Sequence, residues 1–242
     1  MHRFFVQPDC IEGQTVTIAG DDVKHISKVL RLRSGDEITV CDSCGSDYVC
    51  AIDEITQTSV AAHVLQKKPN TAEAPVRITI YQGLPKSDKM DYIVQKCVEL
   101  GVVQIVPVVT KRAVARPHDE DKKLSRWQKI ASEAAKQCGR GIIPRVGAIC
   151  TFEQVISNLS DDGLNILPYE NENQCRLRDV LKGHSGADIN IIIGPEGGFD
   201  ESEISAAQQQ GINIVTLGPR ILRTETAPIA AVSAVMYELG DW

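Results

Sequence analysis

Charged and polar side chains are concentrated near the C-terminus, where the sequence reads "VTLGPRILRTETAP" from Val215 to Pro228. The segment begins like a buried strand and ends like the first turn of a helix. A connection between two such elements needs only a few turn residues. This one contains Arg220, Arg223 and Glu225, side chains that can bind or stabilise charge in a ligand. The composition of the segment therefore predicts a wall of a binding site.

A second segment, "IGPEGGFDESE", also has the composition of a ligand-binding turn. Its glycines permit positive φ and let the backbone approach a ligand closely; they are Gly194, Gly197 and Gly198. Asp200 and Glu203 are predicted to cap the helix that follows. The segment fits neither the dinucleotide-binding nor the P-loop pattern of glycines. Because Glu196 lies inside it, the turn favours a neutral or cationic ligand over a phosphate.

Strands and helices alternate after residue 76, which predicts a mostly parallel sheet with crossover helices. Strands are expected at 76–84, 103–110, 164–170, 189–199 and 212–218, and helices at 87–101, 121–141, 151–159, 200–211 and 228–240. Thr151 and Gln154 have the spacing of a capping box. Ligands of such sheets bind at the carboxyl ends of the strands. We therefore expect "LPYE" (167–170), the glycine turn and the C-terminal segment to lie on one edge of the sheet.

The first 68 residues have a different pattern, with short stretches of alternating apolar and polar residues. They predict strands at 3–7, 14–19, 36–42, 47–55 and 59–68, with one helix at 21–30. This pattern is typical of a small, mostly antiparallel β barrel. Residues 69–75, with no periodicity, are expected to link it to a second domain at 76–242.

The composition is that of a soluble globular protein, with 43% hydrophobic and 24% charged residues. The start of the chain has no apolar signal core, and a cytoplasmic location is expected. The eight cysteines are then expected to be thiols rather than disulfides. Cys41 and Cys44 have metal-like spacing, but zinc usually requires a second close pair. A turn between two strands, without a metal, is the favoured interpretation.

The charge is unevenly distributed along the chain. The net charge is −6, yet residues 76–150 contain 14 Lys and Arg against 7 Asp and Glu. A local excess of positive charge is typical of a phosphate-binding surface, and a solvated helix face is the alternative. The charge alone does not decide between the two.

Several of these motifs together resemble one known family over nearly the full chain. "QGLPKSDKMDYIVQKCVELGV", "RWQKIASEAAKQCGR", "IGPEGGF" and "LGPRILRTETAP" resemble the 16S ribosomal RNA (uracil-N3)-methyltransferases of the SPOUT superfamily. "HRFFV" and "HISKVLRLRSGDEITVCD" are similar to the PUA-like RNA-binding barrel of that family. Cys41 and Cys44 are not part of the pattern.

The resemblance implies a C-terminal, mostly parallel SPOUT-type α/β domain with a trefoil knot, preceded in the sequence by a small PUA-like β barrel. It implies a homodimer that methylates one uridine of the decoding region of 16S ribosomal RNA with S-adenosylmethionine and without a metal. The cofactor would lie against three segments, whose contacting residues would be Leu167, Pro168, Tyr169, Glu170, Gly194, Pro195, Glu196, Gly197, Gly198, Leu217, Gly218, Ile221, Leu222, Thr224, Thr226 and Ala227.

The chemistry of N3 methylation assigns candidate roles. Uridine N3 carries a proton at neutral pH, and the charge of its anion spreads onto the carbonyl oxygens. Arg223 is the first candidate to stabilise that charge and Arg220 the second. Glu225 or Glu196 would accept the proton if burial raised its pKa, and otherwise solvent would do so. Arg223 and Glu225 can also be read as a structural ion pair.

The basic excess predicts a path for RNA across both domains. Its expected contacts are Arg3, Lys28, Arg31, Arg33, Lys86, Lys111, Arg112, Arg116, Lys122, Lys123 and Arg126. Two other interpretations stay open. A ribose 2′-O-methyltransferase of the same superfamily would share the cofactor loops, and a non-catalytic RNA-binding assembly factor would need only the basic surface.

Overall fold

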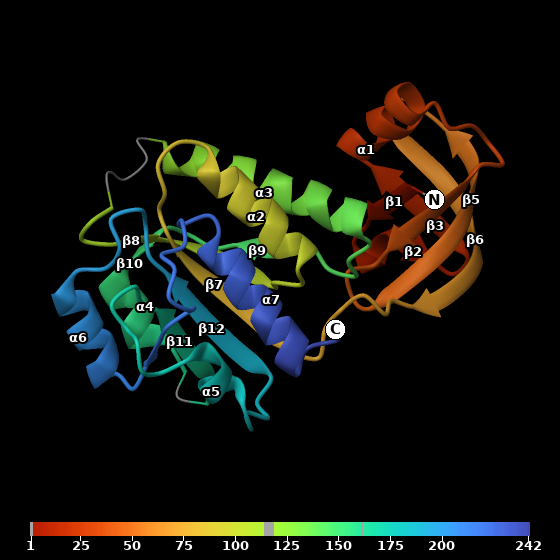
Figure 1. The fold of residues 1–242 in the computed structure, drawn as a ribbon. Coiled ribbons are helices and arrows are strands. Elements are labelled where there is room, and N and C mark those ends of the chain that lie inside the picture. The colour runs from red at the N-terminus through yellow and green to blue at the C-terminus, as the bar shows by residue number, and fades with distance from the viewer. Residues whose placement is uncertain (1, 114–118, 161) are drawn as a thin grey trace. The chain divides into compact units, whose positions relative to one another are not determined.

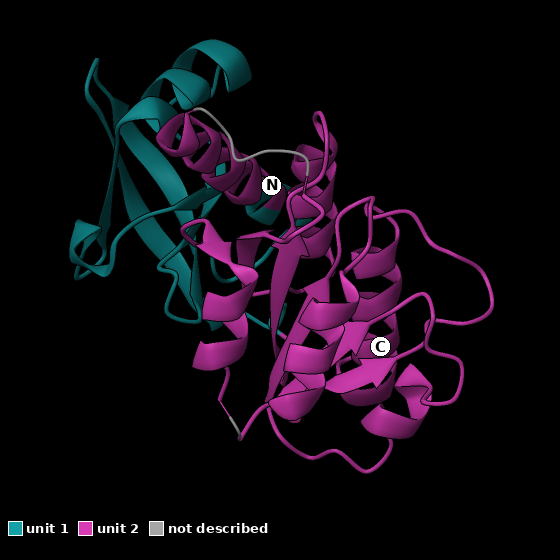
Figure 2. Ribbon diagram, turned by 90° about the vertical axis from the view of Figure 1, so that its left-hand side faces the viewer, with its two compact units in different colours: residues 1–73, 135–143 teal, residues 74–134, 144–242 magenta. Residues whose placement is uncertain are grey.

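The computed structural model describes residues 2–113, 119–160 and 162–242, and the chain forms two compact units. Figure 2 shows the smaller unit, residues 1–73 and 135–143, in teal and the larger unit, residues 74–134 and 144–242, in magenta. The unit boundary at residue 73 lies inside the predicted linker. The assignment of 135–143 to the smaller unit was not anticipated, and the domain limits drawn from the sequence stay a prediction. Arg116 lies outside the described residues.

The smaller unit is built on one six-stranded sheet with the order β1-β4-β5-β6-β3-β2. Its strands are β1 (His2–Phe5), β2 (Ile11–Glu12), β3 (Thr15–Ala19), β4 (Glu37–Cys41), β5 (Ser46–Ile55) and β6 (Ser59–Pro69). β1 pairs with β4 in parallel, and the other neighbouring strands are antiparallel. Within the described residues β1 and β2 form the two edges, so the predicted barrel is a half-barrel.

Side-chain alternation explains how this sheet encloses a core. In β3 Val16 and Ile18 are buried while their neighbours are exposed, as expected for a strand with one solvated face. Around the sheet lie the 3₁₀ helix η1 (Pro8–Cys10), α1 (Asp21–Lys24) and the π-helix η2 (His25–Leu30). The predicted helix at 21–30 is therefore present as α1 and η2. It ends at Arg31, whose φ of 56° is left-handed.

The larger unit contains a parallel sheet with the order β10-β8-β7-β12-β11-β13, and β9 pairs with β8. Its strands are β7 (Arg77–Gly83), β8 (Gln104–Val109), β9 (Arg145–Val146), β10 (Cys150–Thr151), β11 (Leu164–Pro168), β12 (Asp188–Ile193) and β13 (Asn213–Val215). All of the pairings between these strands are parallel, which confirms the predicted α/β class.

Helices cover both faces of this sheet. They are α2 (Lys89–Glu99), α3 (Glu120–Cys138), α4 (Phe152–Asn158), α5 (Leu177–Leu181), α6 (Glu201–Gln209) and α7 (Ala227–Leu239). α7 packs on β7 and β12, while α4 packs on β8 and against α6 (Figure 1). Ile191 and Ile192 of β12 point to opposite faces and are both fully buried. This is why β12 reads as a continuous apolar run rather than an alternating one.

Local sequence signals specified where two of the helices begin. The capping boxes of α4, Thr151 with Gln154, and of α6, Asp200 with Glu203, are both present as predicted. α2 begins at Lys89, later than the predicted start at Ser87. α5 was not predicted, because five residues are too few for a helical period to be visible in the sequence.

Residues 216–226 connect β13 to α7 by passing between two earlier loops. The backbone N–H of Thr216 donates to the Cys175 carbonyl at 2.8 Å, on the side of the loop after β11. The hydroxyl of Thr224 donates to the Gly194 carbonyl at 2.7 Å, on the side of the loop after β12. The trefoil knot that the resemblance implies requires such a passage of the chain. No helix among the described residues is long and apolar enough to cross a membrane.

Candidate cofactor pocket and catalytic site

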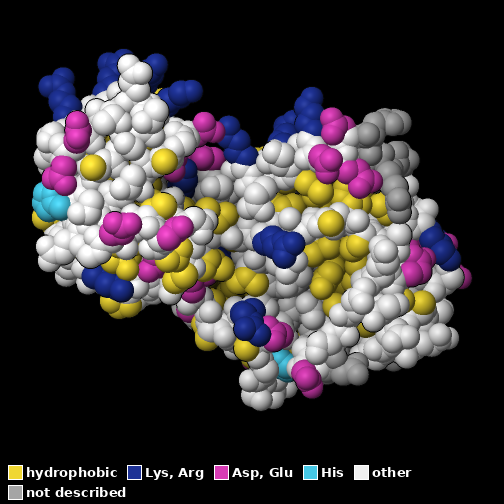
Figure 3. All heavy atoms as spheres, turned by 180° about the vertical axis from the view of Figure 1, so that it is seen from behind, with side chains coloured by type: hydrophobic (Ala, Val, Ile, Leu, Met, Phe, Trp, Pro, Cys, Tyr) yellow, Lys and Arg dark blue, Asp and Glu magenta, His cyan; other side chains and the backbone are white. Residues whose placement is uncertain are grey.

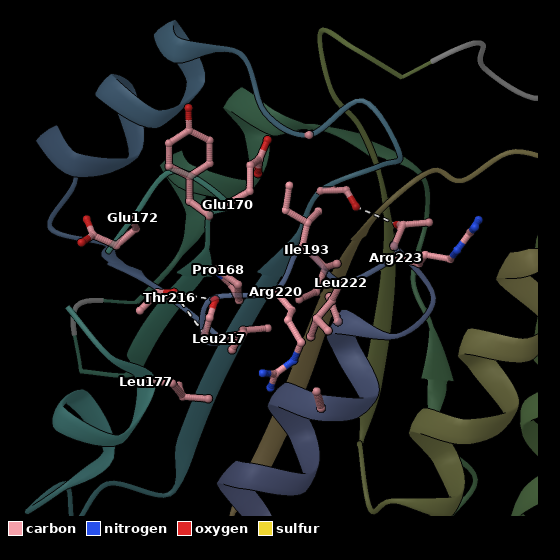
Figure 4. Close-up of a pocket in the computed structure, with 18 of the residues that line it drawn as sticks. Pro168, Glu170, Glu172, Leu177, Ile193, Thr216, Leu217, Arg220, Leu222 and Arg223 are labelled. Atoms are coloured by element: carbon pink, nitrogen blue, oxygen red, sulfur yellow. Dashed lines mark hydrogen bonds between the residues drawn. The ribbon is translucent and has the colours of Figure 1, made fainter. Parts of the chain in front are cut away.

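The three segments singled out in the sequence line one pocket at the carboxyl edge of the parallel sheet, with a volume of about 1570 Å³. The loops after β11, β12 and β13 form its walls, and α5 and α7 extend it. Figure 4 shows Pro168, Ile193, Leu217 and Leu222 converging at its centre. The predicted meeting of the three segments is therefore present in the structure.

Most residues expected to contact the cofactor line this pocket, with two exceptions. Leu167 is fully buried in the core beside Ile192, and Thr226 is outside the lining. The pocket also has contributors that were missed, among them Lys89, Glu172, Arg176, Leu177, Arg178, Leu181, Ile193, Thr216, Ala230, Ala234, Tyr237 and Glu238. Ala230 and Ala234 lie four residues apart, on one face of α7. Small residues at this spacing are the sequence signal by which the pocket-lining face of α7 could have been found.

Two glycines are required by the shape of the pocket wall. Gly198 has φ +67°, and a Cβ there would lie 2.3 Å from Oε1 of Glu170. Gly83, at the end of β7, lies so close to the glycine turn that a Cβ would be 2.6 Å from the backbone nitrogen of Pro195. Glycine at these positions lets β7 approach the turn and lets the Glu170 side chain lie against it.

Thr224 joins the C-terminal segment to the rest of the site from a buried position. Its hydroxyl donates to the Gly194 carbonyl at 2.7 Å and accepts from Nε2 of Gln82 at 3.1 Å. Thr224 and Gln82 are both buried, with exposed fractions of 5% and 0%. Because a buried hydrogen bond is costly to leave unmade, these contacts hold the loops after β12 and β13 together.

The two glutamates considered as bases are both held by Lys89. The Lys89 ammonium lies 3.0 Å from Oε1 of Glu196 and 3.1 Å from Oε2 of Glu225. Burial acts to raise the pKa of each carboxyl, but hydrogen bonds and the charge of Lys89 outweigh it and lower both pKa values. A glutamate that acts as the base would need a pKa raised by burial, and neither Glu196 nor Glu225 has one.

The alternative interpretation, a structural ion pair between Arg223 and Glu225, is not present among the described residues, where Glu225 pairs with Lys89. Arg220 and Arg223 are both exposed and both line the pocket. In Figure 4 the side chain of Arg223 points away from the apolar centre at Ile193 and Leu222. Its guanidinium is thus left available for a ligand.

The basic residues predicted to bind RNA fall into two groups. Lys28, Arg31, Arg33, Lys86 and Lys122 are exposed, and Lys123 is partly exposed. Basic side chains gather over the α1 and η2 end of the smaller unit on the face drawn in Figure 3.

The other group has partners inside the protein. Arg3 forms a bidentate salt bridge with Asp47, in which its two terminal nitrogens each donate to one carboxylate oxygen at 2.7 Å. Arg126 pairs with Asp91, and Arg112 donates to the Gly197 carbonyl. Lys111 donates from its ammonium to Ser202 at 2.7 Å. For these four, part of the charge is used to hold the fold.

Cys44 lies in the predicted turn between β4 and β5, and Cys41 is the last residue of β4. Cys41 is buried, donates to the Gly141 carbonyl, and has its pKa raised to about 11 chiefly by burial. Cys44 is exposed. Among the described residues no cluster of His, Cys, Asp and Glu has the geometry to hold a metal ion.

Comparison with known families gives this architecture a class. Residues 72–236 match the RNA methyltransferase domain, and residues 18–65 match the RNA methyltransferase PUA domain. Together with the parallel sheet and the strand-end pocket, these matches define a SPOUT-type RNA methyltransferase with a PUA domain.

Individual relatives narrow the class. The chain is 34% identical to ribosomal RNA small subunit methyltransferase E of Bacillus subtilis, over 98% of this chain and 97% of that one. The structure of the Neisseria gonorrhoeae methyltransferase E bound to S-adenosyl methionine aligns with a TM-score of 0.92 at 36% identity, covering 100% and 99% of the two chains. A putative methyltransferase of Legionella pneumophila with bound SAM aligns with a TM-score of 0.89 at 28% identity, over 99% and 98%. This chain belongs to the ribosomal RNA small subunit methyltransferase E family.

Proposed function

We propose that this protein transfers a methyl group from S-adenosylmethionine to N3 of one uridine in the decoding region of 16S ribosomal RNA. The observation that carries the proposal is that the loops after β11, β12 and β13 together line one pocket. Family membership and the relatives solved with this cofactor support it. The enzyme would act in the cytoplasm, where ribosomal RNA is made and modified.

The residues of the pocket suit S-adenosylmethionine, which combines a flat base with a zwitterionic, cationic tail. Gly198 has no Cβ, and this lets the Glu170 carboxylate lie against the glycine turn in the pocket wall. Leu217 and Leu222 offer apolar cover for the faces of an adenine. The lining contains both acidic side chains, including Glu170 and Glu172, and basic ones. When bound, the cofactor supplies an activated methyl group on a sulfonium, which needs no metal.

The residues of the chain then have two tasks, alignment of the base and stabilisation of its negative charge. Arg223 is assigned to the second task because its guanidinium is exposed, unpaired among the described residues and at the pocket wall. A planar fork of donors suits a charge spread over a carbonyl oxygen and its neighbour. Arg220, at the same wall, is the second candidate.

The N3 proton is assigned to solvent. Glu196 and Glu225 have lowered pKa values, so at neutral pH they are anions of low basicity. Catalysis by a general base works best when its pKa is near the working pH. Because uridine itself ionises at mildly alkaline pH, the rate of methylation is expected to rise with pH above neutrality.

Mass spectrometry of small-subunit RNA from cells with and without this protein tests the proposed function. Loss of one methylated uridine, with the methyl group remaining after removal of the sugar, is the expected result. Loss of a ribose methyl group would assign the protein to 2′-O-methylation. If the RNA from the two kinds of cell has the same modifications, and the protein still binds ribosomal RNA, the protein would be an assembly factor.

A homodimer is part of the proposal, supported by an apolar surface of the larger unit. Tyr92 of α2 and Tyr237 of α7 are 48% and 74% exposed, and the two helices pack together. Large exposed aromatic side chains are enriched at interfaces. Light scattering is expected to give twice the chain mass of 26.5 kDa, and Tyr237→Glu is expected to shift the mass toward that of a monomer.

A further inference from the structure

Lys89, which was not among the predicted site residues, connects three distant parts of the pocket wall. It is the first residue of α2, and its ammonium contacts Glu196 in the loop after β12 at 3.0 Å and Glu225 in the turn before α7 at 3.1 Å. Its side chain is 28% exposed and lines the pocket. The contacts therefore lie at the edge of the ligand space and not in the core.

Neighbouring contacts show that both loops are held at this point. Glu196 also accepts from the backbone N–H of Lys86, at 3.1 and 3.3 Å to its two oxygens. The Oε2 atom of Glu225 is shielded from solvent. Lys89 is the ion-pair partner of the Glu225 carboxylate within the described residues. Without its ammonium, two carboxylates from separate loops would lose the positive charge that bridges them, and they would repel each other.

The turn held by Glu225 is the one that carries Arg223. Backbone N–H groups of Thr226 and Ala227 donate to the Arg223 carbonyl at 2.8 and 3.0 Å. A displacement of Glu225 therefore moves the base of the Arg223 side chain. The charged groups facing the two carboxylates are Lys89 from α2 and Arg223 from the turn itself.

We propose that Lys89 is a positioning residue for the methyl transfer: through Glu196 and Glu225 it fixes the glycine turn that holds the cofactor and the turn that carries Arg223. This inference rests on the proposed function. It assigns to Glu196 and Glu225 the role of anchors for Lys89 rather than of bases.

If Lys89 positions the two turns, the cofactor affinity of a variant without its charge should depend on pH. A lysine that only stabilises the fold would give no such dependence. In the wild type both carboxyl pKa values are lowered, so both groups stay ionised through the working range. In Lys89→Met burial remains and the compensating charge is lost, so one carboxyl is expected to take up a proton at mildly acidic pH. A protonated carboxyl can donate to the other, which restores the loop geometry. Cofactor affinity of this variant is therefore expected to fall as pH rises from about 5 to about 7.5.

Lys96→Met is the matched control. Lys96 is on the same helix, has a similar exposure of 33%, and pairs with Glu99 at 2.8 Å. Its replacement removes one lysine and one ion pair from α2 without touching the pocket. Lys89→Arg keeps the positive charge, and it tests whether that charge is sufficient to hold Glu196 and Glu225 together.

Calorimetric titration with S-adenosylmethionine at several pH values and single-turnover methylation of small-subunit RNA test the proposal. At pH 7.5 Lys89→Met is expected to lose about tenfold or more in cofactor affinity and about a hundredfold in turnover. Lys89→Arg is expected to recover much of both, and Lys96→Met to match the wild type. Should Lys89→Met fail to fold, Glu225→Gln replaces it and is expected to lower cofactor affinity.

The outcomes separate this inference from the proposed function. If the wild type binds the cofactor and Lys89→Met has the affinity, turnover and pH dependence of Lys96→Met, Lys89 has no positioning role. If the wild type binds the cofactor but methylates no RNA, the proposed function is wrong, while the affinities of the Lys89 variants still decide the inference. A failure of the wild type to bind the cofactor would overturn both.

Discussion

Glu225 is paired with Lys89 at 3.1 Å, although Arg223 is only two residues away in the sequence. The nearer arginine is exposed and has no ion-pair partner within the described residues. This pairing supports separate roles for the two residues: in the proposal above Glu225 anchors the turn, and Arg223 contacts the substrate.

The first prediction tests the assignment of Arg223. Arg223→Lys is expected to keep cofactor affinity and to lose about a hundredfold in single-turnover rate, because lysine keeps the charge but not the planar fork of donors. Glu225→Gln is expected to weaken cofactor binding instead, since it removes an anchor of Lys89. Near-normal turnover in Arg223→Lys would remove the catalytic role. A parallel loss of cofactor affinity in both variants would reassign Arg223 to structure.

The second prediction concerns the glycine turn. Gly198→Val is expected to abolish binding of S-adenosylmethionine in a folded protein, because φ is +67° and the new side chain would collide with the Glu170 carboxylate and displace it within the pocket wall. Gly211→Val is the control, since Gly211 has a similar φ of +71° but no atom within 4 Å of its Cβ position. Calorimetry measures the affinity and circular dichroism the folding. Wild-type affinity in folded Gly198→Val would refute the prediction.

The third prediction concerns RNA binding by α3. Replacing Lys122 and Lys123 by Ala is expected to weaken binding and to reduce the slope of log K against log salt concentration by about 0.7 for each lost phosphate contact. Arg126→Ala is expected to have a smaller effect, because Arg126 already pairs with Asp91. Filter binding at several salt concentrations gives the slopes. An unchanged slope in the double variant would show that these lysines are a solvated face.

The fourth prediction concerns acid stability of the smaller unit. Burial acts to raise the pKa of Asp47, but hydrogen bonds from Arg3 and its charge outweigh it and lower the pKa below its usual 3.8. The stabilisation is therefore present above pH 3.8 and is lost as pH falls through the folded-state pKa. Asp47→Asn is expected to cost about 3 kcal/mol at pH 7, because it leaves the partly buried Arg3 without its counterion.

Thermal unfolding at pH 7 and at about pH 3 measures this difference, which is expected to shrink at the lower pH. Asp53→Asn is the control, because Asp53 pairs with His63 on the same sheet but is 48% exposed. Exposed pairs contribute little, so this variant is expected to unfold near the wild-type temperature. An equal effect of the two substitutions at pH 7 would contradict the prediction.

The sequence by itself determined the features that depend on near neighbours in the chain. The alternation of strands and helices after residue 76 specified a parallel sheet, and the spacing of Asp200 and Glu203 specified the start of α6. Since strands in a parallel sheet end at a common edge, the meeting of the three polar segments in one pocket followed as well. The family resemblance came from the same segments.

Tertiary structure alone decided which charges meet. Arg3 is held by Asp47, and Lys89 joins Glu196 to Glu225, although nothing in their local sequence distinguishes these residues from other surface charges. The short helix α5 and the exclusion of Leu167 from the pocket were settled in the same way. The reason is physical: an ion pair depends on where two distant loops are brought by the packing of their strands and helices. Local spacing records the period of a helix or strand but not that placement.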